Sequence, residues 1–264
     1  MANERLQRIL AAAGIDSRRR CEELILQGAV RVNGRIVDTL PAFADAATDI
    51  ITVDGRRIHK PNKVYFLLNK PKGVICTNDD PGGKTKAIDL IDTKERIFCA
   101  GRLDTETTGA IVLTNDSVLA DRLTHPRFGI EKTYLVTIKG RLSHEEIEKM
   151  KGGVWLSEGK TTPGKLKVLK TSEHESQLEI RIRLGLNREI QRIMARLGHK
   201  VISLKRTHIG KISLERLAIG SYRSLTISEI KYLTQTPERS TGSPKKHGAG
   251  QEFKSKYKSK PPRR

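Results

Sequence analysis

The sequence is poor in aromatic residues and in cysteine. Aromatic side chains make up 4% of its 264 residues, so a hydrophobic core has to depend on Val, Ile and Leu. The three cysteines, Cys21, Cys76 and Cys99, are odd in number and widely spaced. This spacing favours neither a disulfide framework nor a zinc site, and it suits a reducing compartment. We therefore expect a cytoplasmic protein.

Long hydrophobic runs are also missing. No stretch approaches the roughly 18 consecutive apolar residues of a membrane span, and the N-terminal MANERLQRIL is charged where a signal peptide is apolar. Positive charge is abundant: 50 Lys and Arg face 30 Asp and Glu, which gives a formal net charge of +20. Such an excess favours a polyanion or an acidic membrane surface as partner. Because no long basic amphipathic helix with aromatic anchors accompanies it, a nucleic acid is the better fit.

Residues 1–60 read as a small helix-helix-hairpin module. Apolar residues at helical spacing predict a helix over 4–13, capped by Asn3, and a second helix runs from Asp16 or Ser17 to about Gly28. Two β-rich runs then flank Asn33-Gly34, a strong hairpin signal. Basic residues are frequent in this module. They either form an ordinary solvated helix end or bind the phosphates of a nucleic acid. The candidate RNA contacts are Arg5, Arg8, Arg18, Arg19, Arg20, Arg31 and Arg35.

The rest of the chain divides into a second domain and a tail. A basic linker covers residues 56–63, and residues 64–236 alternate β-like runs, among them SYRSLTI at 221–227, with a few helices. Ser143 with Glu146 forms a capping box, and Asn187 is the expected cap of a helix that ends at Gly198. This pattern predicts an α+β fold with a mostly antiparallel, mixed sheet. Residues 237–264 are basic and of low complexity, which predicts a disordered tail that either adds RNA affinity or only aids solubility.

The segment CAGRLDTETTGAIVLTND, residues 99–116, is the strongest candidate for chemistry. It reads as strand, polar turn and strand, and Arg102 and Asp104 face the same way if the backbone is extended. The arginine could keep Asp104 ionised and oriented, as a nucleophile or base requires. Taken by itself, however, an Asp in a turn is more often a local cap.

Two further segments qualify as candidates. Tyr134, which enters the strand YLVTI, could stack on a base or move a proton, although a tyrosine in a β-run usually just packs. Arg188, Arg192 and Arg196 recur every four residues and predict a basic ridge, either on an ordinary surface helix or facing RNA. The scattered histidines and the absence of phosphate-binding glycine patterns predict neither a metal nor a nucleotide cofactor.

GRLDTETTGAIVLTND closely resembles the signature of the bacterial ribosomal pseudouridine synthases of the branch typified by RsuA and RluB. LNKPKG at 68–73, EKTYLV at 131–136, GLNREIQRIMARLG at 185–198, LKRTHIG at 204–210 and SYRSLT at 221–226 resemble further motifs of that family. Residues 4–37 resemble the alpha-L RNA-binding motif that precedes its catalytic domain. The resemblance spans about residues 3–232.

The resemblance implies a cofactor-free isomerase that converts a uridine of ribosomal RNA into pseudouridine. GIEKTYLV at 129–136 looks more like the branch that acts on the 23S large-subunit RNA. Its partner would be ribosomal RNA or a ribosomal subunit precursor, with a monomer as the default state. Asp104 matches the essential aspartate, Tyr134 the tyrosine that contacts the base, and Arg102 the arginine beside the aspartate. The expected substrate contacts are Lys70, Arg188, Arg192 and Leu204.

Gln191 departs from the family pattern, which has Lys or Arg at that position as the partner of the aspartate. Arg188 or Arg192 could supply the missing charge. The departure also keeps open a second reading, a noncatalytic RNA-binding assembly factor on the same fold. The sequence leaves the role of Asp104 open between attack on the sugar and removal of a sugar proton.

Overall fold

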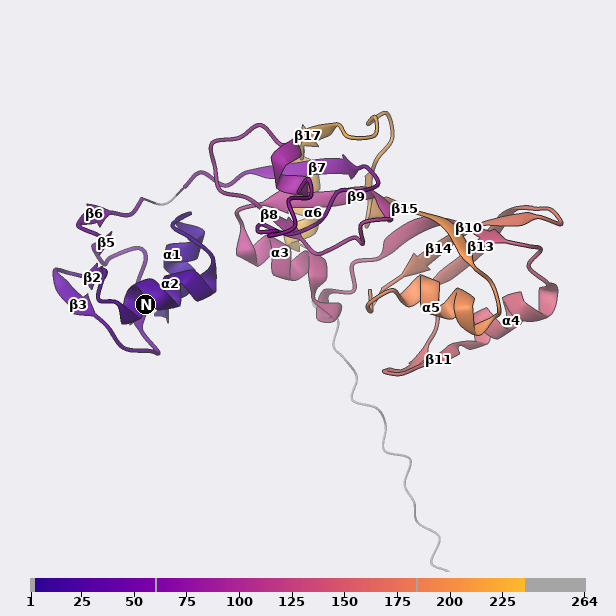
Figure 1. The fold of residues 1–264 in the computed structure, drawn as a ribbon, viewed down its shortest axis with the longest axis horizontal. Helices are drawn as coiled ribbons and strands as arrows, with labels where there is room; N and C mark the ends of the chain where they lie inside the picture. The colour runs from indigo at the N-terminus through magenta and orange to yellow at the C-terminus, as the bar shows by residue number, and fades with distance from the viewer. Residues whose placement is uncertain (1–2, 60, 184, 236–264) are drawn as a thin grey trace, which may run out of the picture.

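The computed structural model describes residues 3–59, 61–183 and 185–235, and the predicted tail at 237–264 lies outside these residues (Figure 1). The N-terminal module and the larger mixed α/β part form separate hydrophobic clusters, the first confined to residues 6–58. Among the described residues, no helix combines the length and the apolar character that crossing a membrane requires.

Two helices and short strands build the N-terminal module. The helices are α1 (Leu6–Ala12) and α2 (Arg18–Leu26). A four-stranded sheet has the order β3-β2-β5-β6, and a separate two-stranded pair joins β1 to β4. The strands are β1 (Glu4–Arg5), β2 (Val30–Val32), β3 (Arg35–Val37), β4 (Phe43–Ala44), β5 (Ile51–Val53) and β6 (Arg56–Arg57).

Local signals predicted most of this module. Ser17 caps α2 by accepting from the backbone N–H of Arg20 at 3.2 Å. Asn33 and Gly34 have φ values of 51° and 83°, which is the left-handed pair that a tight two-residue hairpin needs. The predicted cap Asn3 is wrong. Helix α1 begins at Leu6 with Arg5 at the N-cap position, because residues 4–5 are drawn into an extended pair with β4.

The larger part is built on a nine-stranded sheet with the path β13-β14-β10-β15-β9-β7-β17, to which β8 and β16 are added at β9 and β15. All of its pairings are antiparallel except the one between β9 and β15. The α+β, mostly antiparallel prediction is therefore confirmed. The strands are β7 (Tyr65–Lys70), β8 (Phe98–Ala100), β9 (Thr108–Thr114), β10 (Lys132–Lys139), β13 (Lys165–Thr171), β14 (Glu175–Ile182), β15 (Val201–Ile209), β16 (Ile212–Ser213) and β17 (Tyr222–Ser224).

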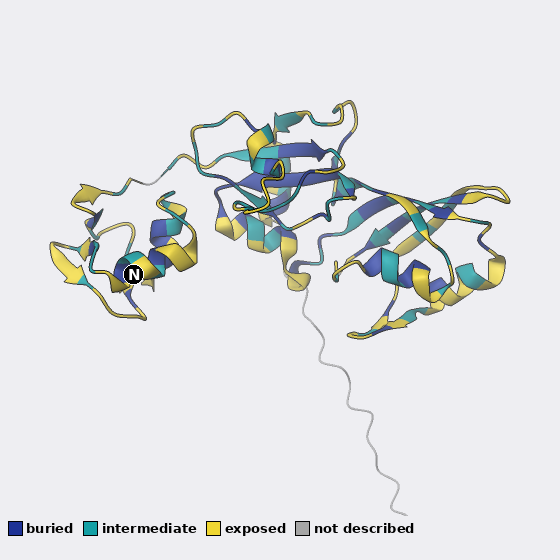
Figure 2. Cartoon of the chain, viewed as in Figure 1, coloured by how far each residue is buried: buried dark blue, intermediate teal, exposed yellow. Residues whose placement is uncertain are grey.

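Helices cover the sheet in two groups (Figure 1). One group lies beneath the half that contains β7 and β9, and its Leu119 and Leu233 share a buried cluster with Val112. The other lies against β10 and β14, where Ile190 and Met194 pack with Val136. The helices are α3 (Ser117–Thr124), α4 (His144–Gly152), α5 (Glu189–Arg196) and α6 (Ile227–Gln235), with the hairpin β11 (Val154–Leu156) and β12 (Gly159–Thr161) beside α5. The central strands β7 and β9 are largely buried, whereas the edge strand β13 and the outer helix faces are largely exposed (Figure 2).

Two local predictions in this part need correction, and one is confirmed. Ser143 and Glu146 form the expected capping box at α4. Asn187 is not the cap of α5, because Arg188 occupies that position with a left-handed φ of 47°. The run at 221–227 is a strand only to Ser224, and Ile227 begins α6, where Leu233 is buried among β7, β9 and α3 side chains.

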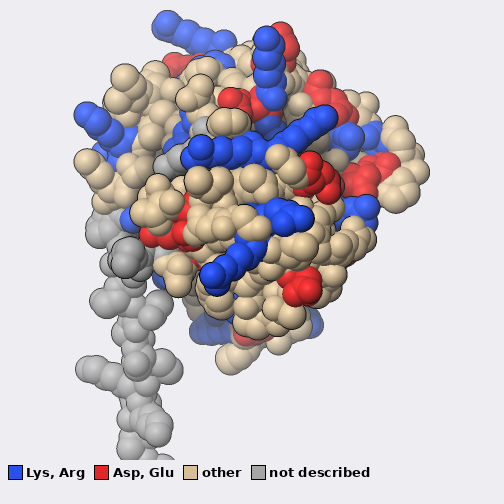
Figure 3. Space-filling view, turned by 90° about the vertical axis from the view of Figure 1, so that its left-hand side faces the viewer, with Lys and Arg blue, Asp and Glu red and all other residues tan. Residues whose placement is uncertain are grey.

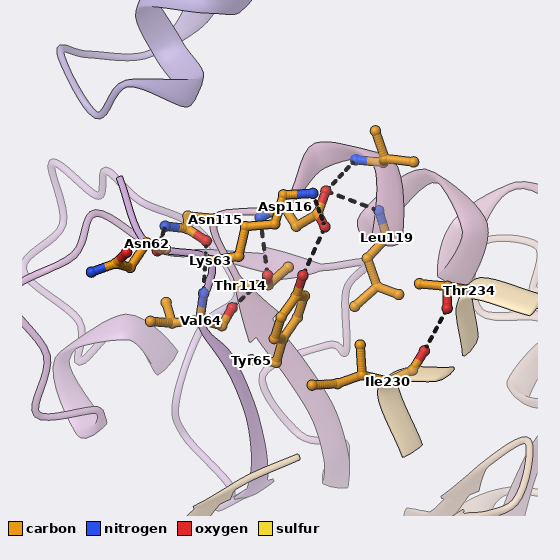
Figure 4. Close-up of polar contacts among 11 residues, drawn as sticks. Asn62, Lys63, Val64, Tyr65, Thr114, Asn115, Asp116, Leu119, Ile230 and Thr234 are labelled. Atoms are coloured by element: carbon orange, nitrogen blue, oxygen red, sulfur yellow. Dashed lines mark hydrogen bonds and ion pairs between the residues drawn. The ribbon is translucent and has the colours of Figure 1, made fainter. Parts of the chain in front are cut away.

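Asp116 anchors the first strand of the larger part (Figure 4). Its carboxylate accepts from Lys63 Nζ at 2.8 Å and from the Tyr65 hydroxyl at 2.9 Å, and its other oxygen caps α3 through the N–H groups of Val118 and Leu119. Although burial opposes it, the hydrogen bonds from Lys63 and Tyr65 hold the pKa of Asp116 below its ordinary value. Burial, reinforced by Asp116, raises the pKa of Tyr65 to about 12.

Candidate active site and RNA-binding surface

A cavity of about 360 Å³ opens between the β8–β9 loop, the faces of β10 and β15 and the beginning of α5. It lies at the parallel step of the sheet, where β9 and β15 pair through Thr108 with Lys205 and Gly109 with Arg206. The polar and charged residues that line it are Arg102, Asp104, Thr107, Thr124, Lys132, Tyr134, Asn187, Arg188, Glu189, Gln191 and Arg206, and Leu204 is among the apolar ones.

Gly109, at the start of β9, allows the β8–β9 loop to lie close to β15. It pairs with Arg206 across the parallel β9–β15 step and has a φ of 105°, which disfavours any side chain. A Cβ atom at this position would collide with the backbone of Arg206. The close approach of the two backbones therefore requires glycine, and it holds residues 101–107 at the rim of the cavity.

The Asp104 carboxylate has two partners from the α5 region. Gln191 Nε2 donates to Asp104 Oδ2 at 3.3 Å, and Arg188 Nε lies 3.6 Å from the same oxygen. Asp104 remains about one-third exposed toward the cavity. The expectation that Arg102 holds Asp104 needs correction: Arg102 lines the cavity but is exposed, and the ion pairs found among the described residues do not join these two side chains. Arg188 provides the positive charge that Gln191 lacks.

Lys70 was expected to contact the substrate, but it does not line the cavity. Its side chain instead binds backbone carbonyl oxygens around the β8–β9 loop. It is fully buried, and its ammonium group donates to the carbonyl oxygens of Val74 at 2.7 Å, Pro71 at 3.0 Å and Thr105 at 3.4 Å. Burial lowers the pKa of Lys70. Since Thr105 directly follows Asp104, this buried cation ties β7 to the loop that carries the aspartate.

Tyr134 and Leu204 form part of the cavity wall together with a buried arginine. Tyr134 on β10 and Arg206 on β15 are direct register partners, and Arg206 Nη1 donates to the Tyr134 hydroxyl at 3.5 Å. Arg206 is 5% exposed and is anchored by Nε, which donates to the Ala110 carbonyl at 2.5 Å. Leu204 precedes Arg206 by two residues, so both side chains face the same side of β15.

Lys132 adds a second cation two residues before Tyr134 on the same face of β10. Burial, together with repulsion from Arg206, lowers the pKa of Lys132 to about 8. Lys132 and Arg206 were not predicted as site residues, although they lie in the motifs EKTYLV and LKRTHIG. The signal that could have found them is the two-residue alternation along a strand, which puts Lys132 on the same face as Tyr134 and Arg206 on the same face as Leu204.

Arg192 is turned away from the cavity, so the predicted ridge is interrupted. Its guanidinium binds Glu158 at 2.7 Å and Ser157 at 3.1 Å in the β11–β12 turn, and it is not among the cavity-lining residues. The reason is geometric: Arg188 precedes the helix in a left-handed conformation, so the four-residue spacing does not align it with Arg192.

The N-terminal module presents its arginines to solvent. Arg8 lies 3.6 Å from Glu4, and Arg20 pairs with Glu23, so part of their charge is compensated. Figure 3 looks onto the side of the molecule where this module lies and shows Lys and Arg side chains projecting over it, with acidic ones between them. All the arginines that the sequence marked in this module are exposed: Arg5, Arg8, Arg18, Arg19, Arg20, Arg31 and Arg35.

Comparison with known proteins agrees with this architecture. Residues 64–196 match the family model for RNA pseudouridylate synthase, and residues 4–40 match the S4 domain. The chain is 40% identical over 233 residues to "Ribosomal large subunit pseudouridine synthase B" of Bacillus subtilis, covering 87% of this chain and 95% of that protein.

Two further relatives extend the comparison. An uncharacterized RNA pseudouridine synthase of Aquifex aeolicus is 37% identical, with 88% of this chain and 94% of that protein covered. A crystal structure described as pseudouridylate synthase aligns with a TM-score of 0.60 at 32% identity, over 87% of this chain and 99% of the other. With its S4 domain and its cavity around Asp104 and Tyr134, the chain belongs to the RNA pseudouridine synthase family of isomerases.

Proposed function

We propose that this enzyme converts a uridine of 23S ribosomal RNA into pseudouridine and that Asp104 is its catalytic carboxylate. The observation that carries the proposal is the environment of Asp104. Its carboxylate is about one-third exposed in the cavity, contacts Gln191 and Arg188, and shares the cavity with Tyr134 and Leu204. The name of the Bacillus subtilis relative supports a large-subunit substrate.

The chemistry follows from what the cavity holds. A uridine has to leave its stack before its glycosidic bond can reach Asp104, and the cost of unstacking is met by contacts elsewhere on the RNA. Asp104 then either attacks C1′ or removes the C2′ proton, and the base rotates beside Tyr134 and rejoins through C5. Tyr134 can stack on the base at low entropic cost, because its ring has only two side-chain torsions and is already packed.

We further propose a separate role for each of three parts of the chain. Residues 1–60 bind RNA through phosphates, residues 64–236 carry the reaction, and residues 237–264 add basic charge. Arg18 and Arg19 are exposed and have no ion pair among the described residues, so they suit phosphate contacts that position the RNA without reading its bases. The enzyme acts as a cytoplasmic monomer without a cofactor.

The test is tritium release from RNA labelled at C5 of uridine, using 23S RNA, 16S RNA and both ribosomal subunits. We expect release from 23S RNA or its subunit, and a loss of more than about 1,000-fold in Asp104→Asn with RNA affinity within a few-fold. Glu106→Gln is the matched control, since this carboxylate lies in the same loop but points to solvent. No release by the wild type, with tight binding retained, contradicts the proposal and favours the noncatalytic binder.

A further inference from the structure

The cavity wall contains two cations that have no acidic partner among the described residues. Arg206 is anchored through Nε and reaches the Tyr134 hydroxyl through Nη1, while its Nη2 is buried without an acceptor. Lys132 lines the same cavity and is likewise absent from the ion pairs of the described residues. A buried guanidinium nitrogen without an acceptor costs roughly 1–3 kcal/mol, so Arg206 keeps donor capacity that no group of the described residues uses.

Lys132 and Arg206 lie on a different part of the cavity wall from the Asp104 carboxylate. Asp104 lies on the β8–β9 loop with Gln191 and Arg188 as partners, whereas Lys132 and Arg206 lie on the strand face that also carries Tyr134. Positive charge is therefore placed on the side of the cavity where the base would lie, in addition to the charge that serves the aspartate.

The reaction creates a negative charge on the base whichever route Asp104 takes. When the C1′–N1 bond breaks, its electron pair stays with uracil, which becomes an anion with charge spread over N1 and the carbonyl oxygens. The Asp104 carboxylate loses its charge at the same step, either by bonding to C1′ or by accepting the C2′ proton. Overall charge is conserved, and one negative charge moves from Asp104 to the uracil.

We propose that Arg206 and Lys132 are further catalytic residues, which bind the carbonyl oxygens of the detached uracil anion and hold it beside Tyr134 while it rotates. Fixed donors aimed at a developing charge inside a water-poor site stabilise a transition state strongly. They also keep the base from escaping before C5 bonds to C1′ and the C5 proton leaves. The proposal rests on the proposed function, but not on the choice between the two roles of Asp104.

The test measures the single-turnover rate of tritium release and RNA affinity separately. We expect Arg206→Gln to slow release about 100-fold and Lys132→Gln about 10-fold or more, with RNA affinity within about 3-fold of wild type. Arg206→Lys and Lys132→Arg, which keep the charge, should retain most of the rate. Lys139→Gln is the control, because this exposed lysine ends the same strand, outside the cavity.

The pH dependence of the rate distinguishes a catalytic role of Lys132 from a purely structural one. The cation of Lys132 is present below its pKa of about 8, so kcat/KM, which reports the free enzyme, should fall above that pH. Lys132→Arg should remove this decline. The other charged groups lining the cavity are Arg206 on β15, Asp104 and Arg102 on the β8–β9 loop, and Arg188 and Glu189 at the beginning of α5.

The outcomes separate this inference from the proposed function. An inactive wild type contradicts the proposed function, whereas an active wild type with normal release rates in Arg206→Gln and Lys132→Gln overturns the inference alone. Weakened RNA affinity in step with the rate also overturns it, since the cations would then serve binding. If Arg206→Gln does not fold, Lys132→Gln decides, because its half-buried side chain has no described hydrogen bond to lose.

Discussion

The side-chain amide of Gln191 on α5 donates to Asp104 on the β8–β9 loop, 87 residues away in sequence, at 3.3 Å. A neutral amide thus occupies the place where the family pattern has a cation, and Arg188 brings the charge from the residue before the helix, 3.6 Å from the same oxygen. Orientation and charge compensation of the carboxylate are therefore divided between two side chains in this protein.

Gln191→Ala should slow tritium release while leaving RNA affinity unchanged. A hydrogen bond to a charged group is worth roughly 1.5–3 kcal/mol, which corresponds to a loss of about 10-fold to 100-fold if the bond is needed in the transition state. Gln191→Lys, which restores a donor, should recover most of the rate. Gln177→Ala on β14 is the control for an amide outside the cavity. An unchanged rate in Gln191→Ala would show that Arg188 alone orients Asp104.

Lys70→Met should lower both stability and turnover. The change removes the common donor of three carbonyl oxygens: that of Val74, which is buried, and those of Pro71 and Thr105, which are partly buried. We expect a loss of about 2 kcal/mol in the free energy of unfolding and a slower chemical step at unchanged RNA affinity. Denaturant unfolding and tritium release measure the two effects.

The control for Lys70 is its neighbour Lys72, which is 69% exposed and pairs with Glu106 on the surface. Lys72→Met should change stability by less than about 1 kcal/mol. Equal effects of the two substitutions would mean that burial of Lys70 contributes nothing specific to the loop.

Asp116→Ala should destabilise the protein by about 3 kcal/mol, because the N-cap of α3, the Lys63 ion pair and the Tyr65 hydrogen bond are lost together. The pKa of Asp116 is depressed in the folded protein. Its pH-dependent contribution is therefore fully present above the ordinary carboxyl value of about 4 and disappears as the pH falls through the lowered pKa.

Denaturant unfolding between pH 7 and pH 3 tests whether the stabilisation by Asp116 decreases as the pH falls. The difference between wild type and Asp116→Ala should shrink toward the acid end. Asp121→Ala, which removes an exposed partner of Arg127, should cost less than about 1 kcal/mol. A difference that grows toward low pH would contradict the assigned ion pair.

Removing charge from the N-terminal module should weaken RNA binding in a salt-dependent way. For the double variant Arg18→Gln and Arg19→Gln, we expect the slope of log affinity against log salt to decrease by about 1.5, if each arginine neutralises one phosphate. The rate of tritium release at saturating enzyme should not change. Lys231→Gln on exposed α6 is the control, and an unchanged slope in the arginine variant would argue for a solvated helix end.

Local sequence signals determined much of the fold. The hairpin at Asn33-Gly34 and the capping box of Ser143 and Glu146 were predictable, because a few neighbouring residues set the backbone conformation there. The mostly antiparallel arrangement followed from the order of the elements, since runs of β-like segments with only a few helices between them are typical of an α+β fold. Asp104 and Tyr134 were marked as site residues by their motifs, and the structure brings both to one cavity.

Tertiary structure decided the features that depend on contacts between distant strands and helices. The buried role of Lys70, the turn of Arg192 toward Glu158 and the pairing of Tyr134 with Arg206 cannot be inferred from neighbouring residues. Packing also overrode local propensity at residue 227, where a β-like run begins a helix over the sheet. The order of the residues is enough to predict which chemical groups are present and the local backbone conformation of turns and caps. Which cations are buried, and which groups they face, depends on the folded sheet, because burial and long-range register arise only when distant strands pair.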